Sequence, residues 1–130
     1  MILGIDPGTK ESGFCIYESF DEYVTGTIKG DARSMPRQLS LLIKASNINI
    51  LAVEDFTNRK WNPRKINTSP DMGKMIGYLS ALFPNIELYG AEDTKRNMQM
   101  IRSKFRNGHE YSAFCVAHHA AGVINRGAES

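Results

Sequence analysis

At 130 residues the chain has the length of one ordinary domain, and its hydrophobic content of 42% is enough for one buried core. This composition excludes a disordered chain, and no apolar run approaches the roughly 20 residues of a membrane-spanning helix. The formal net charge is only +2, but residues 57–106 hold ten Lys and Arg against four Asp and Glu. This basic middle suggests a polyanionic partner, although an ordinary solvated surface would explain the charge equally well.

The N-terminal third predicts three strands. Residues 2–6 are a short apolar run that stops at Pro7-Gly8. This start lacks the basic region and cleavage site of a secretory signal, so we expect an intracellular protein. Residues 12–18 alternate in polarity and are rich in aromatic and branched side chains, and residues 23–28 follow after a turn. Together the three strands predict an antiparallel meander.

Helices and strands then alternate. Leu39, Leu42 and Ile43 have helical spacing and predict a helix over residues 32–46. The apolar run 48–54 predicts a central strand that is covered on both faces. We expect a helix over residues 70–83, a strand over 86–89, a short helix from residue 92 onward and a last helix over 109–125. The apolar side of that last helix is predicted to contain Ala113, Val116, Ala117, Ala120 and Ile124.

The order of these elements predicts a single α/β domain over residues 1–130. Its mixed β-sheet combines the antiparallel three-strand meander with parallel strands and is flanked by helices. Cys15 and Cys115 lie in apolar stretches, so they are expected to be buried small hydrophobes and not a disulfide or a zinc site.

Two carboxylates each end a predicted central strand. Asp6 follows residues 2–5, and Glu54 follows residues 50–53. Ionised groups at such positions are costly unless they are hydrogen-bonded or bound to cations. If the strands are neighbours, both carboxylates meet at one point and suit Mg²⁺ or Mn²⁺. Separately, Asp6 is explained as a turn residue and Glu54 as a surface charge; as a pair they favour a metal site.

A family resemblance begins at the first of these carboxylates. Gly4-Ile5-Asp6-Pro7-Gly8-Thr9-Lys10, followed by Ser12-Gly13-Phe14, resembles the opening strand of RuvC-type Holliday junction resolvases, which belong to the RNase H-like superfamily. Residues 53–56, 89–95 and 109–117 are similar to that family's second acidic strand, its lysine-bearing turn and its last acidic helix. The first motif is fairly specific, and the other three gain weight as an ordered series over nearly the whole chain.

The resemblance implies an RNase H-like fold and a set of site residues. The catalytic set that it implies is Asp6, Glu54, Lys95, His109 and Ser112. Asp6 and Glu54, with His109, would hold two Mg²⁺ or Mn²⁺ ions, and Lys95 would contact the scissile phosphate or the attacking water. No other small-molecule cofactor is expected.

The chain departs from the family pattern in its last helix. The family has an acidic residue or His followed three positions later by Asp, whereas this chain has His109 and Ser112, one helical turn apart. Either metal binding depends on Asp6, Glu54 and His109, or Glu110 or Asp55 compensates, or the protein is weakened or inactive. The stretch between Lys95 and His109 is also shorter than in bacterial members, which suggests a compact variant of phage or organellar type.

The loop after Glu54 combines aromatic, cationic and amide side chains, which is typical of contacts with nucleic acid. Its predicted DNA-binding residues are Phe56, Arg59, Lys60, Trp61, Arg64 and Lys65. By the resemblance, Phe56 is the first candidate for a wedge in the junction and Trp61 the second. A core position for Phe56 and a solvated loop are the plain alternatives.

These observations predict a metal-dependent endonuclease that resolves Holliday junctions or other branched DNA. Symmetric cleavage needs two sites, so a homodimer is expected. No membrane partner is expected. The expected location is the cytoplasm of a bacterial or phage-infected cell, or an organellar matrix. The helix stripe of Met72, Met75, Ile76 and Leu79 is either the dimer face or core. The alternatives are a junction-binding protein that does not cut and an RNase H-like nuclease for other nucleic acids. An actin-like ATPase is disfavoured because it needs two domains.

Overall fold

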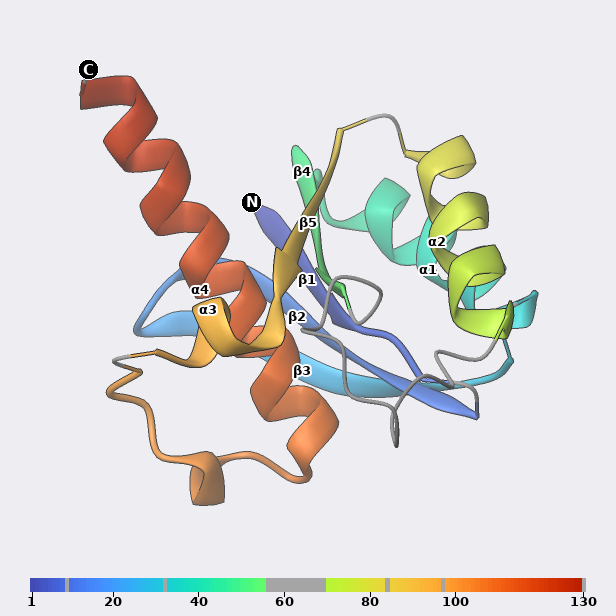
Figure 1. Ribbon diagram of the computed structural model, residues 1–130, viewed down its shortest axis with the longest axis horizontal. Coiled ribbons are helices and arrows are strands. Elements are labelled where there is room, and N and C mark those ends of the chain that lie inside the picture. The colour runs from blue at the N-terminus through green and yellow to red at the C-terminus, as the bar shows by residue number, and fades with distance from the viewer. Residues whose placement is uncertain (9, 32, 56–69, 84, 97, 130) are drawn as a thin grey trace.

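The computed structural model describes residues 1–8, 10–31, 33–55, 70–83, 85–96 and 98–129, with backbone alone at residues 55, 70–73, 91, 92 and 126–129. Five strands form one sheet (Figure 1). They are β1 (Ile2–Asp6), β2 (Glu11–Ser19), β3 (Glu22–Lys29), β4 (Ile50–Asp55) and β5 (Ile86–Gly90). All five were predicted, with ends that differ by no more than two residues.

The strands lie in the order β3-β2-β1-β4-β5. The first three pair antiparallel, which confirms the predicted meander. β4 pairs parallel with β1 on one side and with β5 on the other, so the sheet is mixed as predicted. Leu51, Ala52, Val53 and Glu54 are all fully buried, which confirms that β4 is a central strand covered on both faces.

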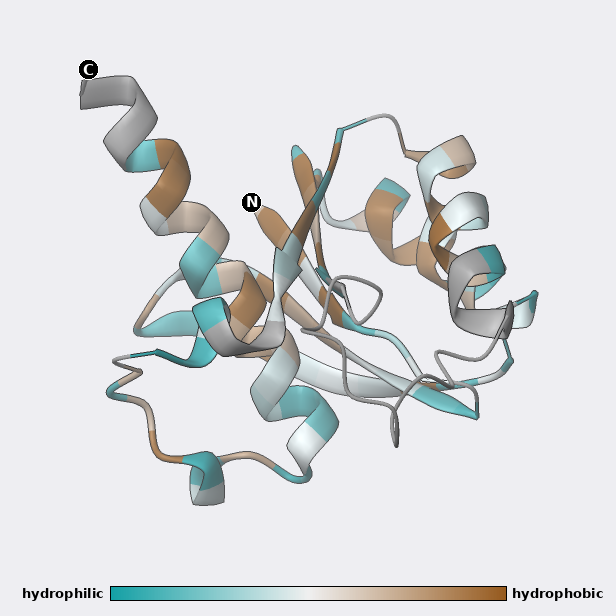
Figure 2. Ribbon diagram, in the orientation of Figure 1, coloured by the Kyte–Doolittle hydropathy of each residue, from teal (hydrophilic) through white to brown (hydrophobic). Residues whose placement is uncertain are grey.

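Helices cover both faces of the sheet (Figure 1). On one face α1 (Ser34–Ala45) and α2 (Pro70–Leu82) pack against β1 and β4 through the main hydrophobic cluster. On the other face lies α4 (Gly108–Glu129), which contacts β1 and β2, with the short α3 (Ala91–Lys95) beside it. Figure 2 shows hydrophobic residues along the central strands. Alternation along β1 directs Leu3 and Ile5 toward α1 and α2.

Some details differ from the predictions. Ile124 was expected on the apolar side of the last helix but is 38% exposed, because α4 extends beyond the sheet there. Met75 and Leu79 belong to the main core cluster, so they cannot form a dimer face. A short 3-10 helix, η1 (Arg102–Lys104), was not predicted, since three residues give no periodic signal. Cys15 and Cys115 are buried and free, as expected.

Two strand glycines bring α4 directly onto the sheet. A Cβ atom on Gly4 would collide with the carbonyl oxygen of Ala113 and lie 2.8 Å from the Ala117 Cβ. A Cβ on Gly13 would collide with the His109 carbonyl group and lie 2.8 Å from the Glu110 nitrogen. The first turn of α4 therefore lies against the backbone of β2, and the turns that follow lie against the backbone of β1. Across the described ranges, no helix is both long and apolar enough to cross a bilayer.

Candidate active site

The parallel register of β1 and β4 brings the two predicted carboxylates together. Ile5 lies opposite Val53, so the next residue of each strand, Asp6 and Glu54, comes at the same level of the sheet. Both face α4, because they alternate with Ile5 and Val53, which face α1 and α2. Their shared position follows from the predicted strand ends and needs no long loop.

Glu54 is a fully buried carboxyl group with incomplete hydrogen bonding. Its Oε1 accepts a hydrogen bond from Lys95 Nζ at 3.2 Å, whereas its Oε2 has no hydrogen-bond partner among the described residues. An ionised carboxylate with one unsatisfied oxygen in the protein interior is costly. The unsatisfied oxygen therefore marks a place where a cation would be stabilised.

Asp6 lies next to Glu54 and is only 6% exposed. Burial, and next to it the charge of Glu54, raise the pKa of Asp6 to about 7, against the opposing effect of His109. His109, in the first turn of α4, has its Nδ1 at 3.0 Å from Asp6 Oδ2. With this pKa, Asp6 is protonated in part of the molecules at neutral pH.

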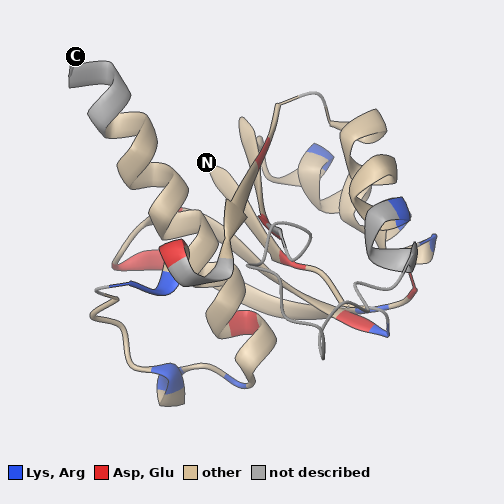
Figure 3. Cartoon of the chain, viewed as in Figure 1, with Lys and Arg blue, Asp and Glu red and all other residues tan. Residues whose placement is uncertain are grey.

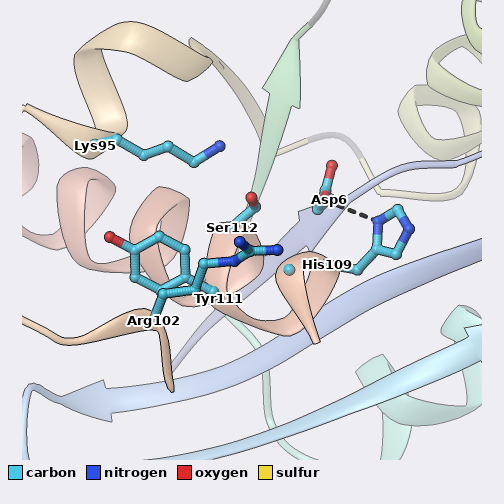
Figure 4. Close-up of a pocket in the computed structure, with 7 residues that line it drawn as sticks. Asp6, Lys95, Arg102, His109, Tyr111 and Ser112 are labelled. Atoms are coloured by element: carbon cyan, nitrogen blue, oxygen red, sulfur yellow. Dashed lines mark hydrogen bonds and ion pairs between the residues drawn. The ribbon is translucent and has the colours of Figure 1, made fainter. Parts of the chain in front are cut away.

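Asp6 opens onto a pocket of about 540 Å³ (Figure 4). Lys95 borders it from the end of α3, and His109 and Ser112 from one face of α4, as their spacing predicted. Lys95 and Arg102 extend into the same space as Asp6. The full lining is Asp6, Lys95, Arg102, Gly108, His109, Tyr111 and Ser112.

Sequence reasoning missed Arg102 and Tyr111 in this pocket. Arg102 lies in the unpredicted η1, and Tyr111 comes one residue before Ser112 on α4. The basic composition of residues 57–106 pointed to this region, but it could not single out one cation. The predicted DNA-binding residues lie outside the described residues and stay predictions: Phe56, Arg59, Lys60, Trp61, Arg64 and Lys65.

The donor groups fit a hard divalent cation through the two carboxylates. Asp6 and the unsatisfied Oε2 of Glu54 supply the oxygen ligands that Mg²⁺ and Mn²⁺ prefer, and water can complete the shell. The Nδ1 of His109 contacts Asp6, so its other ring nitrogen, Nε2, which lies 3.8 Å from Glu11 Oε1, is the atom that could serve as a ligand. Among the described residues, no three His, Cys, Asp or Glu side chains are already gathered as a metal cluster.

Glu110 is held away from the role of a metal ligand. Its Oε1 accepts a hydrogen bond from the Thr25 hydroxyl at 2.9 Å and its Oε2 one from the Thr27 hydroxyl at 3.0 Å. It is 3% exposed and fastens α4 to β3. The suggestion that Glu110 compensates for Ser112 is therefore wrong. The side chain of Asp55 lies outside the described residues, so the same suggestion for Asp55 stays untested.

Glu110→Ala is expected to destabilise the protein by about 2 kcal/mol without lowering its affinity for Mn²⁺, because it removes two buried hydrogen bonds but no proposed metal ligand. The melting temperature should fall by roughly 8 °C. Thermal unfolding and calorimetry with Mn²⁺ test both expectations. The exposed Glu22→Ala is the matched control, and a loss of Mn²⁺ affinity in folded Glu110→Ala protein would return Glu110 to the site.

Solved structures share this architecture. In sequence, the chain matches no protein-family model and none of the curated proteins. In structure, it is similar to Thermus thermophilus RuvC in complex with a Holliday junction substrate, with a TM-score of 0.78 and 15% identity over 97% of this chain and 95% of the other. A second Thermus thermophilus RuvC structure gives a TM-score of 0.71 at 15% identity, covering 97% and 96% of the two chains.

The similarity extends to a viral protein. A complex of Fowlpox virus resolvase with Holliday junction DNA gives a TM-score of 0.55 at 14% identity, over 90% of this chain and 95% of the other. These matches run over nearly the whole chain, and they include the mixed five-strand sheet with helices on both faces. The chain therefore shares the fold of these Holliday junction resolvases.

Proposed function

We propose that this protein is a divalent-metal-dependent endonuclease that cuts branched DNA, with four-way junctions as its substrate. The observation that carries the proposal is the pair of buried carboxyl groups, Asp6 and Glu54, at the ends of two central strands. Asp6 lines an open pocket in a RuvC-type fold, and one oxygen of the fully buried Glu54 has no hydrogen-bond partner among the described residues. Two of the similar structures hold Holliday junction DNA, which supports the choice of substrate class.

Asp6 and Glu54 would hold Mg²⁺ or Mn²⁺, with His109 as a further ligand. We propose two ions per site, as in two-metal phosphodiester hydrolysis. When bound, such ions activate water and stabilise the leaving 3′ oxygen in phosphodiester hydrolysis. In this step the water oxygen forms a bond to phosphorus, and the bond from phosphorus to the 3′ oxygen breaks.

The remaining groups orient the ligands and balance charge. His109 Nδ1 fixes Asp6 through Oδ2 at 3.0 Å, which limits the directions in which that carboxylate faces the pocket. The Lys95 ammonium group lies 3.2 Å from Glu54, at the end of a side chain that is 37% exposed. This places a cation beside the reaction centre, where it offsets negative charge that develops on the phosphate.

A second candidate function is junction binding without cleavage. The observation that favours it is Ser112, which lines the pocket where the resembled family has Asp. A hydroxyl group supplies no negative charge, so the site binds divalent ions more weakly than an acidic set would. In both candidates the protein acts as a homodimer that places two pockets on one junction.

The test is a gel assay with a synthetic four-way DNA junction in Mg²⁺, in Mn²⁺ and in EDTA. We expect paired nicks near the branch point that require a metal, because the carboxylates need a cation to act. A linear duplex and a linear RNA–DNA hybrid are the controls. If wild-type protein binds the junction tightly without nicking it and Ser112→Asp protein does nick it, the binding-only candidate is established. Faster cutting of the hybrid than of the junction would indicate a different RNase H-like nuclease.

A further inference from the structure

We infer that Arg102 is the residue that holds a DNA phosphodiester group in the active-site pocket, a role that the sequence resemblance gave to Lys95. The inference rests on the proposed function, since it names a substrate contact of the same pocket. The described cations that line the pocket are Lys95 and Arg102, and they differ in what they contact. Lys95 forms an ion pair with Glu54, whereas the Arg102 guanidinium group forms no ion pair or hydrogen bond with any described residue.

Arg102 is an exposed side chain at the N-terminal end of α4, a position that favours binding of an anion. It lies against the start of α4, where a Cβ on Gly108 would come within 2.8 Å of a guanidinium nitrogen. The N-terminal end of a helix carries partial positive charge, so an exposed arginine that pairs with no described anion is weakly repelled there. Gly108 makes room for this contact because any larger residue would displace the guanidinium group. A bound phosphate would reverse the sign of the interaction, because both the helix end and Arg102 attract it.

The segment that carries Arg102 is anchored on both sides. Met100 and Phe105 are 8% and 9% exposed and belong to the second hydrophobic cluster. Phe105 stacks on Tyr23 with ring centroids 5.8 Å apart, and its nitrogen donates a hydrogen bond to the Arg102 carbonyl group at 3.0 Å. Arg102 is therefore presented from a fixed backbone, which lowers the entropy cost of binding a ligand.

The chemistry of the guanidinium group fits a phosphodiester. Its planar fork donates two parallel hydrogen bonds to two non-bridging oxygens, which an ammonium group does not do. Other cations follow along the same exposed stretch between α3 and α4 (Figure 3), including Lys104 and Arg106, but they do not line the pocket. They attract DNA in general, whereas Arg102 lines the same pocket as Asp6, in which the cut phosphate would lie.

The test measures affinity for a synthetic four-way junction in EDTA and in Ca²⁺, so that cleavage is not the readout. Arg102→Gln is compared with Lys104→Gln, which removes the same charge two residues away and outside the pocket. We expect Arg102→Gln to weaken binding at least about tenfold relative to Lys104→Gln, with Arg102→Lys in between because it keeps the charge but not the fork. Circular dichroism confirms that each variant is folded.

A second measurement identifies the phosphate. A series of junctions carries one uncharged methylphosphonate at successive positions near the branch point. We expect one position at which wild-type and Arg102→Gln proteins bind alike, because the contact is already lost. If wild-type protein binds the junction but Arg102→Gln and Lys104→Gln bind equally well, Arg102 is not the phosphate contact and the proposed function is unaffected. If wild-type protein does not bind the junction in either buffer, the proposed function is overturned, and this inference with it.

Discussion

Asp6→Asn is expected to abolish junction cleavage and, without metal, to make the protein more stable at neutral pH. Cleavage should fall by about a thousandfold or more, roughly 4 kcal/mol of transition-state stabilisation, because an amide is a poor ligand for Mg²⁺. Stability should rise because the substitution removes one of two carboxylates that share a buried position. Substitution of a residue that serves only the fold would not lower cleavage and raise stability at the same time.

The pH dependence of the stability gain follows from the pKa of Asp6. This pKa is about 7 in the folded protein, against about 3.9 in an unfolded chain. Between these values the folded state binds a proton that the unfolded state has released, so the wild-type protein loses stability as the pH rises through that window. Asn does not titrate. The gain should therefore be absent near pH 4 and reach the order of 2 kcal/mol near pH 8, about 8 °C in melting temperature.

The measurement is thermal unfolding at pH 4 and pH 8, with EDTA and then with Mg²⁺. Added Mg²⁺ should raise the melting temperature of wild-type protein at pH 8 but not that of Asp6→Asn protein. Asp21→Asn, at an exposed position in the turn between β2 and β3, removes the same charge and should change neither property. If wild-type and Asp6→Asn protein melt at the same temperature in EDTA at pH 8, the two carboxylates do not repel each other. If the variant cleaves the junction, Asp6 is excluded as a metal ligand.

The fold was predictable because local signals and sheet topology agree in this chain. The apolar runs at residues 2–6 and 48–54 marked the two central strands, and a polar residue at the end of each marked the site. The order of elements then restricted the topology, since crossovers between parallel strands have one favoured hand. Ile124 was misplaced because periodicity continues along a helix that has left the sheet.

The site was only partly predictable, because some of its features depend on contacts between distant segments. His109 and Ser112 share a helical face, which their spacing shows. Glu110 resembled a spare ligand in sequence, but Thr25 and Thr27 on β3 hold it elsewhere. Nothing local distinguishes Arg102 from Lys104, and only the packing of η1 against α4 brings Arg102 into the pocket.

Gly13→Ala is expected to damage both stability and the active site, although the residue carries no side chain and contacts no ligand. In sequence, Gly13 was notable as part of Ser12-Gly13-Phe14, which completes the first motif of the family resemblance. In the structure it lies within β2, opposite Asp6, where an added Cβ would collide with the backbone of His109. Backbone atoms cannot rotate out of the way as a flexible side chain can, so the first turn of α4 must move.

That movement would separate His109 from Asp6 and shift Ser112 within the pocket. We expect a loss of about 3 kcal/mol of stability, typical of overpacking in a rigid site, and a loss of cleavage at temperatures where the variant is still folded. Thermal unfolding and the junction assay measure the two effects.

Gly122→Ala, a substitution within α4 itself, is the matched control, because a Cβ there meets nothing within 4 Å. It should stabilise α4 by about 0.5–1 kcal/mol, as alanine does in a helix interior, and leave cleavage unchanged. One methyl group would then have opposite effects at a glycine packed between β2 and α4 and at a glycine of α4 that faces open space. If Gly13→Ala protein were as stable and active as wild type, the close packing of α4 on β2 could not be what positions the catalytic residues.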